Sequence, residues 1–267
     1  MVPNNGDRKS HNPQNNNQRN NLRSDRSQHT SEEHLIVALD YPSWEEAEKL
    51  VRRLPEVHLF KVGLELYLAS GGQAVSKLKE LGKEVFLDLK FHDIPNTVGR
   101  ACRQAVEQGA AIFNLHASGG REMMQQGVKA ARERAAELGV SLPLVIAVTV
   151  LTSLDQQALQ EIGLEDVEKT VINFAKLAEE TGMDGVVASS KEITLIRKYC
   201  GEDFKIICPG IRPEWAAVND QKRIMTPREA ISLGADFLVV GRPITAADDP
   251  RQAALRVLEE IEKAILR

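Results

Sequence analysis

The chain has 267 residues, of which 42% are hydrophobic and 27% are charged, with a formal net charge of −4 at pH 7. This composition is ordinary for a globular protein, and the slight negative charge argues against a general nucleic-acid-binding protein. No apolar run is long enough to span a bilayer, so we expect no membrane partner.

The first 33 residues differ in composition from the rest. They are rich in Asn, Gln, Arg and Ser, so we expect residues 1–33 to form a disordered tail and residues 34–267 to form the folded domain. This start also lacks the apolar segment of a secretory signal, which predicts a cytoplasmic protein. Because Cys102, Cys200 and Cys208 match no zinc pattern, we expect reduced thiols in or near a core.

Eight short apolar runs then follow, separated by polar turns and stretches of helical character. They predict strands over residues 34–40, 59–66, 84–90, 110–117, 142–150, 184–190, 204–210 and 236–242. Between the first two runs, Ser43 and Glu46 have the spacing of a helix capping box. Gly182 stands where a later helix is expected to end.

Strands that are apolar nearly throughout and that alternate with helices indicate a parallel sheet covered by helices. Eight such units fit a (β/α)8 TIM barrel, whose usual size is about 250 residues. A doubly wound open sheet is the alternative. Its dinucleotide-binding form needs a glycine-rich first turn, and "ALDYPSWEE" has none.

Charged residues stand at or near the carboxyl ends of the first three predicted strands, where barrels of this kind carry the active site. They are Asp40, Lys61, Asp88 and Lys90. Any one of them alone could be an incidental solvated charge. Together, four charges of alternating sign can keep one another ionised when buried, which predicts a preorganised electrostatic site.

A second polar pattern follows the last strand. In "GRPIT", Gly241 allows close approach of a ligand to the backbone, Arg242 is a fixed cation and Pro243 suits the start of a short helix. "CPGIRP" adds Gly210 and Arg212 after the seventh strand. These barrels often bind phosphate after strands seven and eight, so we expect a phosphate monoester ligand, with a plain Gly-Pro turn as the alternative.

Other candidates are weaker. His92 and His116 could act as acid–base groups, but we favour supporting hydrogen bonds for both. "ASGGRE" over residues 117–122 could hold an anion or form a tight turn. Because no His, Asp and Glu residues show metal-ligand spacing, we expect neither metal nor cofactor.

The stretch "FLDLKFHDIPNTV" resembles the orotidine 5′-phosphate decarboxylase family, whose members convert orotidine 5′-phosphate to UMP in pyrimidine synthesis. "IVALD" and "FKVGLEL" before it, and "PGIRP" and "VVGRPIT" after it, extend the resemblance from residue 34 to about residue 260. The D-x-K-x-x-D core followed by "HDIPNT" is highly specific. The resemblance implies a homodimeric TIM barrel that works without metal or cofactor.

The resemblance also implies residue roles. The catalytic residues would be Lys61, Asp88, Lys90 and Asp93, with Lys90 as the proton donor to C6 of the pyrimidine and Asp88 beside the departing carboxylate. Asp40 and Lys61 would hold the ribose.

Further substrate contacts follow from the same resemblance. Asp93 would reach the neighbouring subunit's site, with Ile94 and Thr97 beside it. The pyrimidine, the phosphate and the closing loop would be contacted by Thr152, Pro209, Arg212, Gln221, Gly241 and Arg242.

Two alternatives stay open. The 3-keto-L-gulonate 6-phosphate decarboxylases and hexulose phosphate synthases of the same suprafamily share D-x-K-x-x-D, but they use magnesium and lack "HDIPNT". A non-catalytic barrel that senses nucleotide phosphates is the alternative from another class, and the intact charged row disfavours it.

Overall fold

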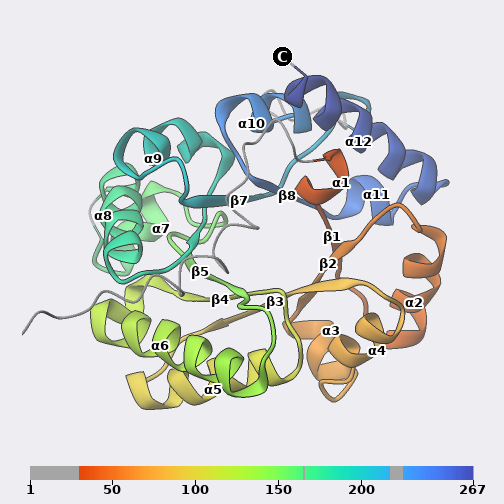
Figure 1. Cartoon of the computed structure of the whole chain (residues 1–267). Coiled ribbons are helices and arrows are strands. Elements are labelled where there is room, and N and C mark those ends of the chain that lie inside the picture. The colour runs from red at the N-terminus through yellow and green to blue at the C-terminus, as the bar shows by residue number, and fades with distance from the viewer. Residues whose placement is uncertain (1–29, 165, 217–224, 267) are drawn as a thin grey trace, which may run out of the picture.

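Eight parallel strands, paired in chain order with β8 closing against β1, form a barrel surrounded by helices (Figure 1). The structure is a computed structural model that describes residues 30–164, 166–216 and 225–266. The strands are β1 Leu35–Leu39, β2 Leu59–Gly63, β3 Glu84–Phe91, β4 Ile112–His116, β5 Leu144–Val148, β6 Gly185–Val187, β7 Lys205–Pro209 and β8 Phe237–Val240. The predicted (β/α)8 fold is confirmed, and each strand overlaps its predicted run.

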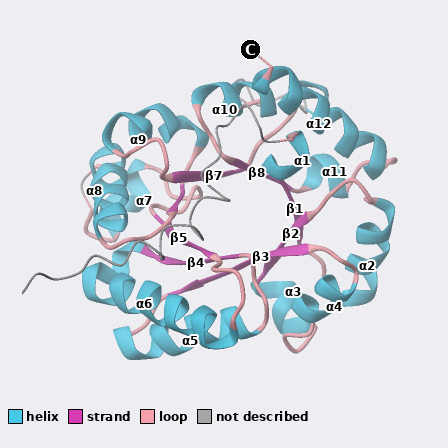
Figure 2. Ribbon diagram, in the orientation of Figure 1, coloured by secondary structure: helices cyan, strands magenta, loops and turns pink. Residues whose placement is uncertain are grey.

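The helices lie outside the barrel (Figure 2). Their bounds are α1 Ser31–His34, α2 Trp44–Arg53, α3 Leu64–Ala69, α4 Ala74–Glu80, α5 Pro95–Glu107, α6 Gly120–Leu138, α7 Gln156–Glu161, α8 Val167–Glu180, α9 Ile193–Tyr199, α10 Pro227–Leu233, α11 Arg242–Thr245 and α12 Pro250–Ile265, with short 3-10 turns η3 Ala117–Gly119, η4 Ser190–Glu192 and η5 Glu214–Ala216.

Several predicted runs extend past the observed strands, as at residues 142–150 around β5 and residues 184–190 around β6. The second run does not stay extended to residue 66, because α3 begins at Leu64 directly after Gly63. We expected residues 31–33 in the tail, but they belong to α1. In this helix Glu32 Oε2 lies 2.9 Å from His58 Nε2. The rest of the predicted tail, residues 1–29, lies outside the described residues.

Local sequence signals explain the helix ends. Ser43 caps α2, because its side chain accepts a hydrogen bond from the backbone N–H of Glu46 at 3.3 Å. Gly182 follows α8 with φ of 82°, a left-handed conformation that favours glycine. Both helix ends that the sequence predicted are therefore confirmed.

The core has two layers, because side chains alternate between the barrel interior and the helices. Ile36, Leu59 and Phe86 belong to the interior layer, whereas Phe60 and Leu87 pack in the layer between strands and helices. Residues that follow an interior position by two also point inward. This alternation places Lys61, Asp88 and Asn114 in the barrel interior.

Cys102, Cys200 and Cys208 are free and buried, as the sequence predicts. Burial raises the pKa of the Cys102 thiol to about 12 and that of Cys200 to about 11, so both stay protonated at neutral pH. No helix in the described part of the chain combines the length and apolarity that a membrane crossing requires.

Candidate active site

The four predicted charges meet at the carboxyl ends of β1, β2 and β3. Lys61 Nζ lies 3.1 Å from Asp40 Oδ1 and 3.5 Å from Asp88 Oδ2, and Lys90 Nζ lies 2.6 Å from Asp88 Oδ1. Asp40, Lys61, Asp88 and Lys90 therefore form one continuous row of alternating charge, which we call the charged row. The side chain of Asp88 is 12% exposed and that of Asp40 is 64% exposed, so the row runs from the barrel interior to the surface.

Asp88 is the central member of the charged row. Its burial opposes ionisation, but the charges of Lys61 and Lys90, together with hydrogen bonds from Lys90 and Asn114, outweigh that effect. The pKa of Asp88 is therefore lowered from its ordinary value. The carboxylate stays charged at neutral pH and holds an ammonium group on each side.

The end of β3 is irregular where it carries Lys90. In the pairing with β4, Leu87 stands opposite Phe113 and Phe91 opposite Leu115, so residues 88–90 face the single residue Asn114. Lys90 has φ of 52° and is the one non-glycine residue with positive φ in the described chain. A side chain in this left-handed region costs on the order of 1 kcal/mol or more. Such strain is a common feature of active sites.

The charged row borders a small cavity of about 140 Å³. Lys61, Asp88 and Lys90 supply its charged wall. The other lining residues come from β3, β5, β6, β7, β8 and the segment after β5, and are Phe86, Val148, Val150, Leu151, Thr152, Val187, Pro209 and Val239. The cavity therefore brings five predicted site residues together, with an apolar wall opposite the charges.

Asp93, Ile94 and Thr97 do not line this cavity. All three are exposed, and Ile94 is 66% exposed although it is a large apolar side chain. The Asp93 carboxylate accepts a hydrogen bond from the backbone N–H of Ile94 at 2.6 Å, just before α5 begins. These residues therefore face outward from this chain.

The predicted phosphate residues lie in the loops after β7 and β8. Arg242 is exposed and begins α11, and Gly210 has φ of 76°. The backbone N–H groups of Ile244 and Thr245 donate to the Gly241 carbonyl, so this single-turn helix does not offer those two groups to an anion. The cation of Arg242 is then the stronger part of the predicted site.

Two further residues complete this part of the prediction. Arg212 is half-buried, and its backbone N–H donates to the carbonyl of Met225 at 3.1 Å. Gln221 lies outside the described residues.

The two histidines lie beside the charged row. Their ring centroids are 5.3 Å apart and the rings are tilted by 41°. Burial, with the charges of His92 and Lys90, lowers the pKa of His116, which keeps it neutral at pH 7. The supporting hydrogen bonds that we expected for the two imidazoles are not found among the residues described. The segment that begins at Ala117 forms the turn η3 and the start of α6, with Gly120 at φ of 84°.

Sequence reasoning missed two residues of the site. Asn114 is fully buried, and its side chain contacts both Asp88 and the backbone of Lys90. An amide inside the apolar run "AAIFNLHA" was the available signal. Gly63 is the second, because a Cβ there would lie 3.1 Å from Lys61 Nζ. A larger residue at position 63 would press on the charged row.

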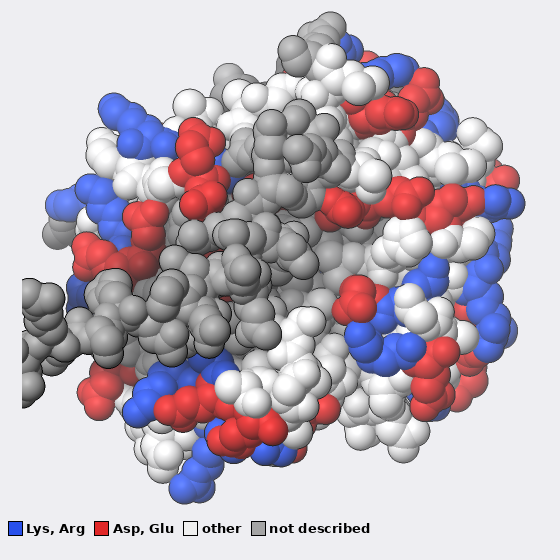
Figure 3. All heavy atoms as spheres, in the orientation of Figure 1, with Lys and Arg blue, Asp and Glu red and all other residues white. Residues whose placement is uncertain are grey.

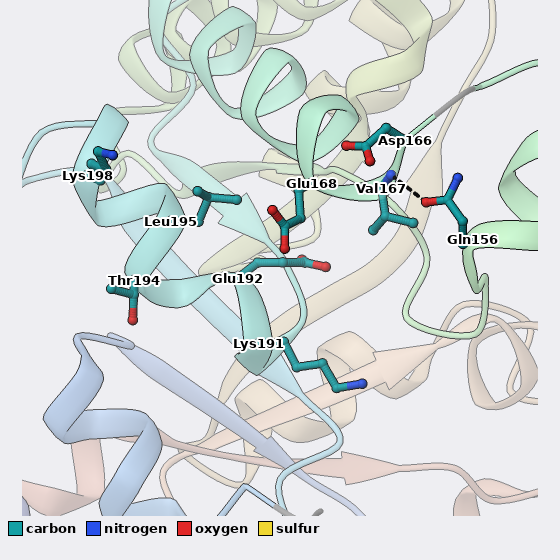
Figure 4. A pocket seen from close by; sticks show the side chains of 9 residues that line it. All are labelled: Gln156, Asp166, Val167, Glu168, Lys191, Glu192, Thr194, Leu195 and Lys198. Atoms are coloured by element: carbon teal, nitrogen blue, oxygen red, sulfur yellow. Dashed lines mark hydrogen bonds between the residues drawn. The ribbon is translucent and has the colours of Figure 1, made fainter.

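A larger hollow lies elsewhere on the molecule. We call it the α8–α9 groove, and its volume is about 570 Å³. Figure 4 shows the residues that line it, which are Gln156, Asp166, Val167, Glu168, Lys191, Glu192, Thr194, Leu195 and Lys198. Burial, reinforced by the charge of Glu168, raises the pKa of Glu192 to about 7. Acidic and basic side chains are also interspersed over the described part of the face in Figure 3. The charged row differs from this surface because its central pair, Lys61 and Asp88, has side chains only 12% exposed.

Comparisons with known proteins agree with this geometry. The sequence model of the "Orotidine 5'-phosphate decarboxylase / HUMPS family" matches residues 33–257. The chain is 54% identical over 231 residues to the orotidine 5'-phosphate decarboxylase of Moorella thermoacetica, covering 85% of this chain and 92% of that protein. It is 49% identical to the enzyme of the same name from Syntrophomonas wolfei, over 87% of this chain and 99% of that protein.

Solved structures give the same result. The crystal structure of orotidine 5'-phosphate decarboxylase from Lactobacillus acidophilus superposes with a TM-score of 0.77 at 35% identity, covering 86% of this chain and 99% of that one. An uncharacterized conserved protein from Geobacillus kaustophilus superposes with a TM-score of 0.75 at 40% identity, covering 85% and 99% of the two chains. By sequence and by fold, this chain belongs to the orotidine 5'-phosphate decarboxylase / HUMPS family.

Proposed function

We propose that this protein decarboxylates orotidine 5′-phosphate to UMP, without metal or cofactor, as a step of pyrimidine synthesis. The observation that supports this most directly is the charged row bordering the 140 Å³ cavity, with Lys90 Nζ held 2.6 Å from Asp88, whose side chain is 12% exposed. The relatives named orotidine 5'-phosphate decarboxylase support the choice of substrate. The magnesium-dependent suprafamily members remain the alternative.

The proposed chemistry uses the charged row as a fixed electrostatic environment. The bond from C6 to the carboxylate carbon breaks, CO2 leaves, and the electron pair stays on C6 as a carbanion. The Lys90 ammonium stabilises that charge and then transfers its proton to C6, which gives UMP. Water then returns a proton to the Lys90 amine. Because negative charge at C6 forms only during the reaction, the stabilisation acts on the transition state.

Asp88 orients both lysines, because its carboxylate pairs with Lys61 on one side and with Lys90 on the other. A lowered pKa keeps Asp88 ionised, so its carboxylate can hold the Lys90 side chain and face the departing carboxylate of the substrate. Repulsion between those two carboxylates would also raise the energy of the bound substrate, which is a smaller part of the proposal. Asp40 and Lys61 would bind the ribose at the exposed end of the row.

The phosphate would be held away from the reacting carbon. We assign it to Gly241 and Arg242. From the family resemblance we also propose Arg212 and Gln221 as contacts of the phosphate or the closing loop, and Thr152 and Pro209 as contacts of the pyrimidine. Arg242 is exposed and so is accessible to a dianionic ligand. Binding energy from the remote phosphate can hold the base against Lys90 and exclude water.

We further propose a homodimer in the cytoplasm. The exposed Asp93, Ile94 and Thr97, which do not reach their own chain's cavity, support contact with a second subunit's site. The free buried thiols suit a reducing compartment.

The experiment that tests the function uses purified protein, orotidine 5′-phosphate and excess chelator, followed by ultraviolet absorbance and CO2 release. We expect conversion to UMP at a rate that the chelator does not change. A folded protein that gives no conversion would contradict the proposed reaction. Activity that appears only after magnesium is restored, with a sugar phosphate as substrate, would support the alternative.

A further inference from the structure

We propose that Asn114 is a positioning residue that holds Asp88 and Lys90 in their working geometry across the irregular end of β3. The inference rests on the proposed function, since it concerns how the same charged row is built. It adds a residue to which neither the resemblance nor the comparisons give a role.

The geometry of the bulge creates the need for such a residue. Residues 88–90 of β3 stand opposite Asn114 alone, so the regular ladder between β3 and β4 is interrupted where the charged row begins. The Asn114 side chain fills this interruption. Its Oδ1 accepts from the Lys90 backbone N–H at 2.8 Å, and its Nδ2 donates to Asp88 Oδ1 at 2.7 Å.

The chemistry of the two partners fixes the orientation of the amide. An ionised carboxylate only accepts hydrogen bonds, and a backbone N–H only donates. An amide is the side chain that offers both an acceptor and a donor in this spacing. Asn114 is fully buried, so no bulk water competes for either bond.

The two bonds act on different parts of the charged row. The bond to the Lys90 N–H holds the backbone at φ of 52°, a conformation that the surroundings must stabilise for a lysine. The bond to Asp88 fixes the carboxylate oxygen that also pairs with Lys90 Nζ. Asn114 therefore holds the Asp88 carboxylate and the Lys90 backbone in place, although it is not among the residues that line the cavity.

The first test replaces Asn114 with alanine and measures kcat and the dissociation constant of UMP. A small misplacement of a reacting group costs about 10²-fold, so we expect kcat of Asn114→Ala to fall about that far while UMP affinity changes little. The acid limb of the kcat profile should move to higher pH, because Asp88 loses a hydrogen bond that stabilises its charged form. Unchanged kcat and an unchanged profile would overturn the inference.

Asp184→Ala is the matched control. Asp184 precedes β6 and its Oδ2 accepts from the Val145 backbone N–H at 2.8 Å, so it too holds a strand backbone through a side chain, outside the charged row. We expect this variant to lose stability but to keep kcat per folded molecule. If both variants lose only stability, Asn114 is structural and the positioning role is wrong.

The nearly isosteric Asn114→Asp keeps the test decisive if the alanine variant does not fold. The new carboxylate can accept a hydrogen bond from the Lys90 backbone N–H but, when ionised, cannot donate one to Asp88. We therefore expect kcat to fall and the dependence of kcat on pH to change shape. Wild-type kcat and profile in this variant would overturn the inference.

The wild-type protein in the same assay separates the two proposals. Absence of conversion by wild type contradicts the function, and amide hydrogen exchange of Lys90 then reports on Asn114 alone. We expect that amide to exchange faster in Asn114→Asp or Asn114→Ala than in wild type. Equal exchange rates would overturn the positioning role.

Discussion

The charged row and the α8–α9 groove each contain a carboxylate that is largely shielded from solvent, and the pKa values of the two shift in opposite directions. Asp88 has Lys61 and Lys90 beside it, and its pKa is lowered. Glu192 accepts a hydrogen bond from the Ser189 backbone N–H at 2.9 Å but has Glu168 nearby, and its pKa is raised to about 7. At Asp88 the charges of Lys61 and Lys90 outweigh the effect of burial, whereas at Glu192 the charge of Lys191 does not.

The same comparison shows why size alone does not identify the site. The groove measures about 570 Å³ and the cavity about 140 Å³. The groove lies between helices, whereas the cavity lies at the carboxyl ends of the strands, where groups from many strands converge. Only the cavity combines an apolar wall with paired, ionised groups, so we assign the chemistry to it.

Removing the proton donor should give the largest effect. We expect Lys90→Ala to lower kcat by at least about 10⁴-fold, since it loses both a general acid and a transition-state cation. Circular dichroism and thermal unfolding should show a folded protein, because Asp88 keeps Lys61 and Asn114 as partners. Substantial kcat in a folded variant would contradict the role of Lys90.

Removing Lys61, the second cation beside Asp88, should raise the pKa of Asp88 and so bring its environment closer to that of Glu192. We expect Lys61→Met to lower kcat by about 10²-fold or more, as for loss of one preorganised charge. A lowered pKa contributes stability that is present above the unfolded pKa and lost as pH falls through the folded pKa. Without Lys61 the pKa of Asp88 rises, so acid unfolding should begin at higher pH.

Acid titrations followed by circular dichroism would measure that shift. Lys129→Met is the matched control, because Lys129 is 67% exposed and lies 3.9 Å from Glu133 on the surface. Equal acid midpoints for the Lys61 and Lys129 variants would argue against the pairing of Lys61 with Asp88.

Arg242 tests binding apart from chemistry. Loss of a charged hydrogen-bond partner costs about 1.5–3 kcal/mol, so Arg242→Ala should raise KM about 10- to 100-fold. We expect a smaller change in kcat, because Arg242 is assigned to the phosphate and not to C6. Steady-state kinetics separate the two constants, and a fall in kcat alone would contradict the assignment.

Substitution of Glu192 should have the smallest effect on activity, because it should change only the pH dependence of the folding stability. Its folded pKa of about 7 lies above the unfolded value of about 4.5, so the folded state binds the extra proton between these pH values. Stability therefore falls as pH rises through this window, by at most ~3 kcal/mol, and levels off above it. Glu192→Gln should remove this fall and leave kcat unchanged.

Urea unfolding between pH 4.5 and 8 would measure the effect. Glu192 forms a capping box with Ser189 at the start of η4, and Glu229 forms the equivalent capping box with Thr226 at the start of α10. Glu229→Gln is therefore the control, because Glu229 is exposed. If Glu192→Gln keeps the wild-type pH dependence, the raised pKa of Glu192 is wrong.

Most of the fold was predictable because strand alternation and helix caps are local signals. The charged row was predictable because Asp40, Lys61, Asp88 and Lys90 stand at or near the carboxyl ends of three successive predicted strands. The left-handed Lys90 and its bond to Asn114 were not predictable, since they depend on an interruption in the pairing of two strands. The short helix at Pro243 was predictable, but the bonding of the Ile244 and Thr245 N–H groups to the Gly241 carbonyl was not, because those groups could equally have been free for an anion.

The most direct test of the account is a crystal structure of the protein with UMP. We predict that the pyrimidine fills the cavity beside the charged row, with C6 facing Lys90 Nζ and the phosphate at Arg242. UMP bound in the α8–α9 groove, or in the cavity with C6 turned away from Lys90, would contradict the assignment of the chemistry to the charged row.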